Sequence, residues 1–194
     1  RQQGAKKLSQ AIHQQLAALY MEKTVFSVHF KATSTVHFYP TGLDDVEFYI
    51  QTNPGEAAGP LAKIASGGEL SRMMLALKTI FTRSQGITSI IFDEVDTGVS
   101  GRVAQAIADK ISAIARFSQV LCITHLPQVA AMSDQHFFIR KQISGQRTKT
   151  TLTRLQPAQR VDELARMLSG TAVTKLTREH ASELLKLAAA EKKR

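Results

Sequence analysis

Ser89-Ile90-Ile91-Phe92-Asp93-Glu94 is a short apolar run that ends abruptly in two acids. This pattern predicts a buried strand of a parallel sheet, with both carboxylates at its carboxyl end. Adjacent strand residues point to opposite sides, so Asp93 and Glu94 can perform different tasks. One can hold Mg²⁺, and the other can position or deprotonate an attacking water. The alternative is a capping loop with two solvated acids, which the preceding apolar run does not favour.

A second apolar run, residues 120–124, is followed by His125, and a helical pattern over 102–116 connects the two runs. Strand, helix and strand at this spacing predict a βαβ crossover, and therefore an α/β fold with a parallel sheet at its core. If the strands are neighbours, His125 lies beside Asp93 and Glu94 at one sheet edge. A lone histidine is usually structural, but at this edge it has a reason to contact the γ-phosphate of a nucleotide.

Ser66-Gly67-Gly68-Glu69 opens a predicted helix over 67–84. Ser66 followed three residues later by Glu69 is a capping box, which explains those two residues but not the glycines. Each glycine costs helix stability, by roughly 0.5–1 kcal/mol relative to alanine. In return, glycines leave bare N–H groups at the positive end of a helix, where a phosphate can approach closely. Capping and phosphate binding both remain open from these residues alone.

The rest of the chain alternates helical and strand-like patterns. We expect an amphipathic helix over 6–22, strands at 24–30, 35–40 and 46–50 forming a small antiparallel meander, a loop from 53 to about 65, a hairpin of 136–143 with 148–155, and helices at 158–168 and 174–190. The apolar side of the helix over 67–84 is predicted to carry Leu70, Met73, Met74, Leu77 and Ile80.

The chain is strongly basic. Its 194 residues carry a formal net charge of +9, which favours polyanionic partners and nucleic acid first. One candidate patch lies on and around the predicted hairpin. It comprises Arg140, Lys141, Arg147, Lys149 and Arg154. A solvated hairpin face is the equally good alternative for these residues.

Cys122 is the single cysteine and lies in an apolar run, which predicts a buried core thiol. One cysteine excludes an internal disulfide and a cysteine-based metal site, and it fits a reducing compartment. No apolar run approaches the roughly 18 residues of a membrane span. We therefore expect no membrane association.

A phosphate-binding loop of the form G-x-x-x-x-G-K-[ST] is absent from the sequence. A phosphate-handling sheet without this loop cannot bind nucleotide in the ordinary way. The first residue is Arg1 rather than methionine. Together these features lead us to expect that the chain is one part of a larger nucleotide-binding protein.

Four motifs in order resemble those of ABC-type ATPases. Ser66 to Glu69 resembles the signature motif, Ile90 to Glu94 resembles Walker B with its catalytic glutamate, Asp96 resembles the D-loop aspartate, and Thr124-His125 resembles the switch histidine. Longer stretches, namely 52–55, 65–72, 92–98 and 124–130, resemble the RecN family of bacterial SMC-like DNA repair ATPases. The resemblance covers about residues 8 to 190.

The resemblance implies a split head, in which an N-terminal half brings the Walker A loop and a coiled coil links it to the C-terminal half. Residues 1–23 would be the end of a coiled-coil helix, and 24–194 would be the C-terminal lobe of the head. ATP and Mg²⁺ are the implied cofactors. Asp93 would help hold Mg²⁺, Glu94 would polarise the attacking water, and His125 would contact the γ-phosphate.

The implied nucleotide-binding residues are Ser66, Gly67, Gly68, Glu69 and Asp96. The serine and the glycines would reach across to the nucleotide on the opposite head of a homodimer. Hydrolysis would be coupled to head engagement and so to tethering DNA during recombinational double-strand-break repair, in the cytoplasm at the nucleoid. The isolated chain, without Walker A, is expected to be inactive alone.

Two other functions fit parts of the pattern. A transporter-type ABC nucleotide-binding fragment shares Ser-Gly-Gly, but such proteins usually carry Walker A in the same short chain. A non-catalytic DNA-binding or dimerisation module would use the positive charge and keep the acids as relics. The intact Asp93-Glu94 pair argues against relics.

Overall fold

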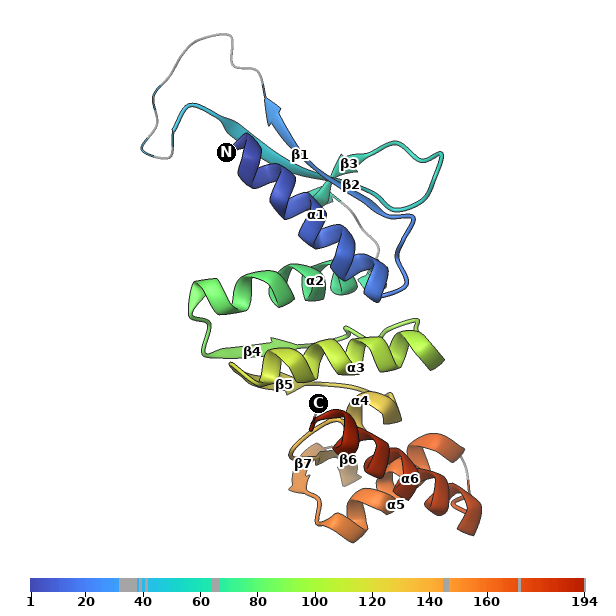
Figure 1. Ribbon diagram of the computed structural model, residues 1–194. Coiled ribbons are helices and arrows are strands. Elements are labelled where there is room, and N and C mark those ends of the chain that lie inside the picture. Colours follow the sequence, from blue (N-terminus) through green and yellow to red (C-terminus); the bar gives the residue numbers. More distant parts are fainter. Residues whose placement is uncertain are drawn as a thin grey trace.

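The computed structural model describes residues 1–31, 38, 40, 42–63, 67–144, 147–170 and 172–193 (Figure 1). The helices are α1 (Gln2–Ala18), η1 (Leu61–Lys63, a 3-10 helix), α2 (Gly67–Gln85), α3 (Gly101–Ala115), α4 (Pro127–Ala131), α5 (Pro157–Ser169) and α6 (Lys175–Glu191). The strands are β1 (Val25–Lys31), β2 (Asp45–Gln51), β3 (Gly59–Pro60), β4 (Ser89–Phe92), β5 (Gln119–Cys122), β6 (Phe137–Ser144) and β7 (Arg147–Arg154). Ser66 lies outside the described residues.

The centre of the fold is the predicted βαβ unit. β4 pairs with β5 in parallel, from Ser89 opposite Gln119 to Phe92 opposite Cys122, and α3 makes the crossover. Figure 1 shows α2 and α3 stacked against this strand pair. The buried side chains of Ile90 and Phe92 belong to the same core cluster as those of the two helices. The predicted parallel pair is therefore confirmed.

One face of the strand pair is exposed, contrary to the expectation that β4 is buried on both faces. Ile91 is 69% exposed whereas its neighbour Ile90 is 8% exposed. Leu121 and Ile123 on the β5 side are also about half exposed. Successive strand residues point to opposite faces, so the described elements cover only the Ile90 face. The result is an uncovered apolar surface made of Ile91, Leu121 and Ile123.

An N-terminal layer packs α1 against α2 and β1. Ile12 and Leu16 form the buried stripe of α1, which begins and ends about four residues earlier than predicted. β1 and β2 are antiparallel, as expected, and Gly59–Pro60 adds a third strand beside β2. The predicted strand over 35–40 lies largely outside the described residues, and its two described members, Phe38 and Pro40, are not in a strand.

On α2, four of the five predicted apolar positions face inward at least in part, but Met74 is 42% exposed. The buried positions Met73, Leu75 and Ala76 are nearly consecutive, because α1 and α3 pack on two sides of the helix. This double packing widens the buried stripe beyond the single face that a 3.6-residue period predicts.

The C-terminal layer contains α5, α6 and the antiparallel hairpin β6–β7. α4 was not predicted, since five residues are too few to display a helical period. Its end is clamped by Arg160 of α5, whose Nη2 donates to the carbonyl oxygens of Ala131 at 2.8 Å and Ser133 at 2.6 Å. This clamp ties the C-terminal layer to the segment that follows β5.

We predict that replacing Ile91 and Leu121 with threonine lowers concentration-dependent self-association. The free energy of unfolding should change by less than about 0.5 kcal/mol, because these side chains are already in water. The matched control is Ile90→Thr, which buries a hydroxyl in the core and should cost about 2 kcal/mol. Analytical ultracentrifugation and urea unfolding measure the two quantities. Equal stability losses for the two variants would contradict the assignment of the faces.

Candidate functional site

The carboxyl ends of β4 and β5 form one edge. The N–H of Ile123 donates to the carbonyl oxygen of Phe92 at 2.9 Å, which continues the pairing one residue past the strands. The acids Asp93 and Glu94 follow directly on one strand, and Thr124-His125 follow on the other. Both acids are exposed. The two strands are thus neighbours, and His125 shares their edge, as the sequence predicts.

Asp96 is the buried polar centre of this edge. Its side chain is 2% exposed, and its Oδ2 accepts a short hydrogen bond from the Thr124 hydroxyl. The same oxygen accepts from the backbone N–H of His125 at 3.3 Å. The Thr124 Oγ in turn accepts from the N–H of Leu126 at 3.0 Å. Asp96 therefore fastens the turn after β4 to the segment after β5.

The same carboxylate orients the imidazole of His125. Nδ1 lies 3.6 Å from Asp96 Oδ2, a distance for electrostatic attraction rather than for a hydrogen bond. Nδ1 faces Asp96, so Nε2 of the 67%-exposed ring is left for an external group. Asp96 Oδ2 already accepts hydrogen bonds from Thr124 and His125. Direct contact between Asp96 and a nucleotide therefore stays a prediction.

Glu94 adopts a strained backbone conformation. Its φ is 57°, in the left-handed region that side chains other than glycine rarely occupy. The N–H of Thr97 donates to the carbonyl oxygen of Glu94 at 3.3 Å, and the next residue, Val95, is buried. The tight turn thus presents the Glu94 carboxylate to solvent while it buries the two residues that follow. Strain of this kind costs on the order of 1 kcal/mol and tends to occur at functional sites.

The two glycines of the predicted signature have different surroundings. A Cβ placed on Gly68 would lie 2.8 Å from the carbonyl oxygen of Thr97, whereas one on Gly67 would meet nothing within 4 Å. Gly68 therefore lets the start of α2 approach the turn that carries Glu94 and Asp96. No atom of the described chain requires a glycine at 67, so phosphate binding at this position stays a prediction. The capping role of Ser66 lies outside the described residues.

Arg72 belongs to this site although the sequence analysis gave it no role. Its Nη1 would be 3.5 Å from a Cβ on Gly68, and its Nε donates to the sulfur of Met21 at 3.4 Å. Burial lowers the pKa of the guanidinium, while the charge of Glu69 opposes this effect. A partly buried cation near the positive end of α2 is unfavourable by itself. Because the conflict depends on burial, the sequence alone carried no signal for Arg72.

Cys122 is partly buried rather than fully enclosed in the core. Burial, aided by the negative charges of Asp96 and Asp93, raises the pKa of its thiol to about 12. The side chain is therefore an uncharged thiol at neutral pH, which excludes a role as an activated nucleophile.

Within the described residues, no three histidine, cysteine or acidic side chains are arranged to hold a metal ion. Asp93 offers one exposed carboxylate, which fits the way proteins bind Mg²⁺, through one or two carboxylates together with substrate phosphates. None of the helices in that part of the chain is suited by length and composition to crossing a bilayer.

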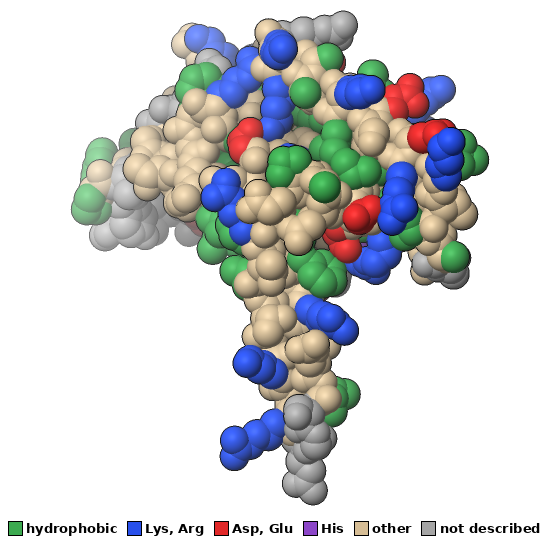
Figure 2. All heavy atoms as spheres, turned by 90° about the horizontal axis from the view of Figure 1, so that it is seen from below, with side chains coloured by type: hydrophobic (Ala, Val, Ile, Leu, Met, Phe, Trp, Pro, Cys, Tyr) green, Lys and Arg blue, Asp and Glu red, His purple; other side chains and the backbone are tan. Residues whose placement is uncertain are grey.

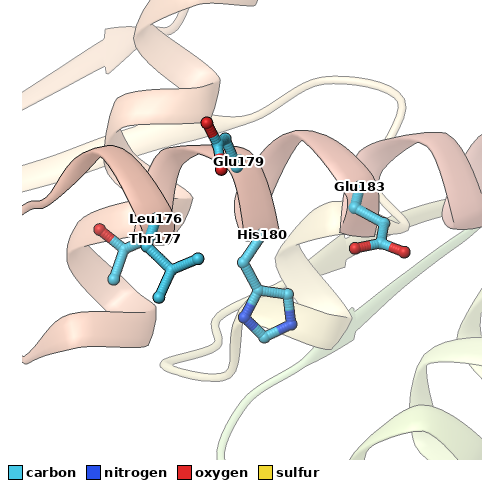
Figure 3. A pocket seen from close by; sticks show the side chains of 5 residues that line it. All are labelled: Leu176, Thr177, Glu179, His180 and Glu183. Atoms are coloured by element: carbon cyan, nitrogen blue, oxygen red, sulfur yellow. The ribbon is translucent and has the colours of Figure 1, made fainter.

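A shallow hollow of about 410 Å³ lies elsewhere, along α6. Figure 3 shows that its labelled side chains all come from this one helix. They are Leu176, Thr177, Glu179, His180 and Glu183. A surface built by a single helix offers no enclosed binding site, so we assign it no ligand.

Comparisons with known proteins find relatives along almost the whole chain. The chain is 60% identical over 190 residues to the DNA repair protein RecN of Halalkalibacterium halodurans, covering 97% of this chain and 34% of that protein. It is 53% identical over 197 residues to RecN of Bacillus subtilis, covering 95% and 34%. The chain spans about a third of the length of these relatives and matches their C-terminal part.

The fold resembles that of a solved Smc head. The crystal structure of the Smc head domain with a coiled coil and joint from Pyrococcus yayanosii matches with a TM-score of 0.60 at 18% identity, over 84% of this chain and 29% of that one. No protein-family model matches the chain. The α/β architecture is therefore that of an SMC-type ATPase head, as predicted.

We predict that Gly68→Ala lowers the free energy of unfolding by about 1–3 kcal/mol, because the new methyl group collides with the Thr97 carbonyl. Gly67→Ala is the matched control. It meets no atom and should be neutral or stabilising by up to about 1 kcal/mol. Urea unfolding of the two variants compares them directly. A stability loss at position 67 as large as that at 68 would refute the different roles assigned to the glycines.

We also predict that Asp96→Ala costs about 1–3 kcal/mol, because it leaves the Thr124 hydroxyl and the His125 N–H without their acceptor. Asp93→Ala removes an equal charge from an exposed position and should change stability by less than about 0.5 kcal/mol. Adding Thr124→Val to Asp96→Ala should cost less than the sum of the single changes, since both break one network. A loss for Asp96→Ala no larger than that for Asp93→Ala would contradict this account.

Proposed function

We propose that the chain is the C-terminal lobe of an SMC-like ATPase head that hydrolyses ATP in DNA repair, because it matches the C-terminal parts of RecN proteins. The relatives at 60% and 53% identity are named DNA repair proteins. One observation carries the enzymatic part of the proposal. Asp96 fastens the His125 segment to the turn that presents Asp93 and Glu94, so three chemically active side chains share one solvent-facing edge.

The roles follow from chemistry and exposure. Glu94 would position and polarise the attacking water, because its carboxylate is exposed and its backbone is held in a tight turn. Asp93 would bind Mg²⁺, which neutralises charge on the phosphate oxygens when bound. His125 would donate or accept a hydrogen bond at the γ-phosphate through Nε2, since Nδ1 faces Asp96.

The start of α2 would bind a second nucleotide. Gly67 leaves open space at the positive end of a 19-residue helix, where backbone N–H groups attract phosphate. Ser66 and Glu69 would complete this signature, and Asp96 would contribute through the segment that it orders. In this proposal the bound phosphate belongs to the nucleotide of an opposing head, so two heads form a homodimer with ATP between them.

The missing phosphate-binding loop defines a further partner. We infer that the uncovered apolar surface of Ile91, Leu121 and Ile123 packs against the Walker A half of the same protein. That half would bring the loop to the edge formed by Glu94 and His125. Residues 1–23 would be the end of the connecting coiled-coil helix, and 24–194 would form the lobe itself. The chain alone would then be inactive.

The last part of the proposal is that the full-length protein tethers DNA during double-strand-break repair. It would do so in the cytoplasm, at the nucleoid. The support for this part is the name of the relatives and the formal charge of +9. The same charge favours a second candidate function, a DNA-binding or dimerisation module without catalysis. A strained glutamate that stays exposed beside a histidine is better explained by hydrolysis than by such a module.

We predict that Glu94→Gln in the full-length protein lowers Mg²⁺-dependent ATP turnover at least 100-fold and leaves ATP binding intact, because the amide cannot polarise water. Glu94→Gly should abolish turnover equally but raise the free energy of unfolding by about 1 kcal/mol, because glycine tolerates a positive φ. Phosphate release, nucleotide binding and urea unfolding measure these effects. Undiminished turnover in Glu94→Gln would contradict the catalytic role of Glu94, and absence of turnover in the unaltered full-length protein would favour the module without catalysis.

A further inference from the structure

The β6–β7 hairpin stands away from the rest of the molecule. Figure 2 shows it as a narrow stalk that projects from the body, with Lys and Arg side chains along its length. Each strand has eight residues, which corresponds to about 26 Å at the usual strand rise. At its root, the Arg166 guanidinium of α5 lies 5.8 Å from the centre of the Phe138 ring. This contact fixes the root, while the outer part has water on both sides.

The register separates the side chains of the hairpin into two faces, because antiparallel partners point to the same side. The basic face carries Arg140 opposite Thr151, Gln142 opposite Lys149, and Arg147 near the tip. The apolar face carries Phe137, Ile139, Ile143 and Leu152, together with Lys141 and Arg154. The five-residue patch predicted from charge density is therefore divided, with three of its members on one face.

The positive charge of the basic face is not neutralised. Residues 137–154 contain no aspartate or glutamate. Within the described part of the chain, no salt bridge engages Arg140, Arg147 or Lys149. Three carboxylates in the neighbouring layer have cationic partners of their own. They are Asp134 with Lys192, Asp162 with Arg178, and Glu163 with Arg166.

We propose that the basic face of the β6–β7 hairpin binds the phosphates of duplex DNA, with the hairpin lying as a two-stranded ribbon along a groove. This deepens the proposed function and rests on it, because it names the surface through which the ATPase head contacts DNA. A two-stranded ribbon fits the major groove, which is about 12 Å wide. Guanidinium groups bind phosphate oxygens in pairs, and a lysine adds a point charge.

The polar neighbours on this face suit the same partner. Gln142 and Thr151 carry groups that hydrogen-bond to phosphates or base edges, and they alternate with the three cations. A length of about 26 Å lets the ribbon follow most of one turn of DNA, which rises about 34 Å. The competing interpretation is that the hairpin docks another protein instead of DNA, and DNA binding that is unchanged without the three cations would favour it.

The test uses the full-length protein and a fluorescein-labelled 30-base-pair duplex, with affinity measured by anisotropy between 50 and 300 mM NaCl. Arg140→Gln, Arg147→Gln and Lys149→Gln combined should weaken binding at least tenfold at the lowest salt concentration. The slope of log affinity against log salt should become shallower by about 3, one unit for each lost phosphate contact. Each single substitution should lower the slope by about one unit.

The matched control is Lys175→Gln, Lys186→Gln and Lys193→Gln combined, which removes the same charge from exposed positions on and just after α6. It should leave the slope unchanged and affinity within about twofold, because only direct phosphate contacts release counterions. An equal loss in both triple variants, or no loss in the hairpin variant, would overturn the proposal. Thermal unfolding of both variants checks that the fold is intact.

A third variant addresses the other face. Ile139→Thr with Leu152→Thr should keep the DNA affinity and the salt slope of the unaltered protein. A loss of DNA binding in this variant, with normal binding in the basic-face variant, would reject the proposal, because DNA contact would then depend on the apolar face. ATP turnover of Glu94→Gln decides the ATPase function separately. Failure of the hairpin proposal would therefore leave the proposed function standing, and the reverse also holds.

Discussion

The buried carboxylate of Asp96 is the interaction on which the rest of the site depends. Parallel pairing brings the ends of β4 and β5 together, but it does not fix the loops that follow them. Asp96 does so by accepting from the Thr124 hydroxyl and the His125 N–H. A carboxyl group on a residue that is only 2% exposed is stable there because these donors replace water. The bonds set the position of His125 relative to Glu94, so stability and chemistry share one group.

Two local features of this arrangement are unfavourable or sterically tight. Glu94 has a φ of 57°, and Gly68 brings a helix start against the Thr97 carbonyl. Both features crowd the same turn, which holds Val95 and Asp96 inside the core while Glu94 remains in solvent. A turn built only for stability would place glycine at position 94. The glutamate is better explained by a requirement for a carboxylate at this edge.

The parts of the fold that depend on local sequence pattern were predicted correctly. The parts that depend on contacts between distant residues were not. Apolar runs and a helical period located β4, α3 and β5, and the strand ends located Glu94 and His125. The anchoring role of Thr124 was missed because a threonine beside a histidine carries no signal until Asp96 is placed in space. The two-residue strand β3 depends on pairing with β2 rather than on its own composition. The exposure of Ile91 was missed because strand composition does not tell which face is covered.

The most direct test of the central claim is Mg²⁺-dependent ATP hydrolysis by this chain alone and after mixing with a separately produced segment that carries the Walker A loop. The account predicts no turnover by the chain alone and turnover in the mixture, because Glu94 and His125 would then face a bound γ-phosphate. The same mixture made with a Glu94→Gln chain should be inactive. Turnover by the chain alone would show that nucleotide is bound without a phosphate-binding loop and would contradict the account. Absence of turnover from a mixture whose two parts bind each other would contradict it as well.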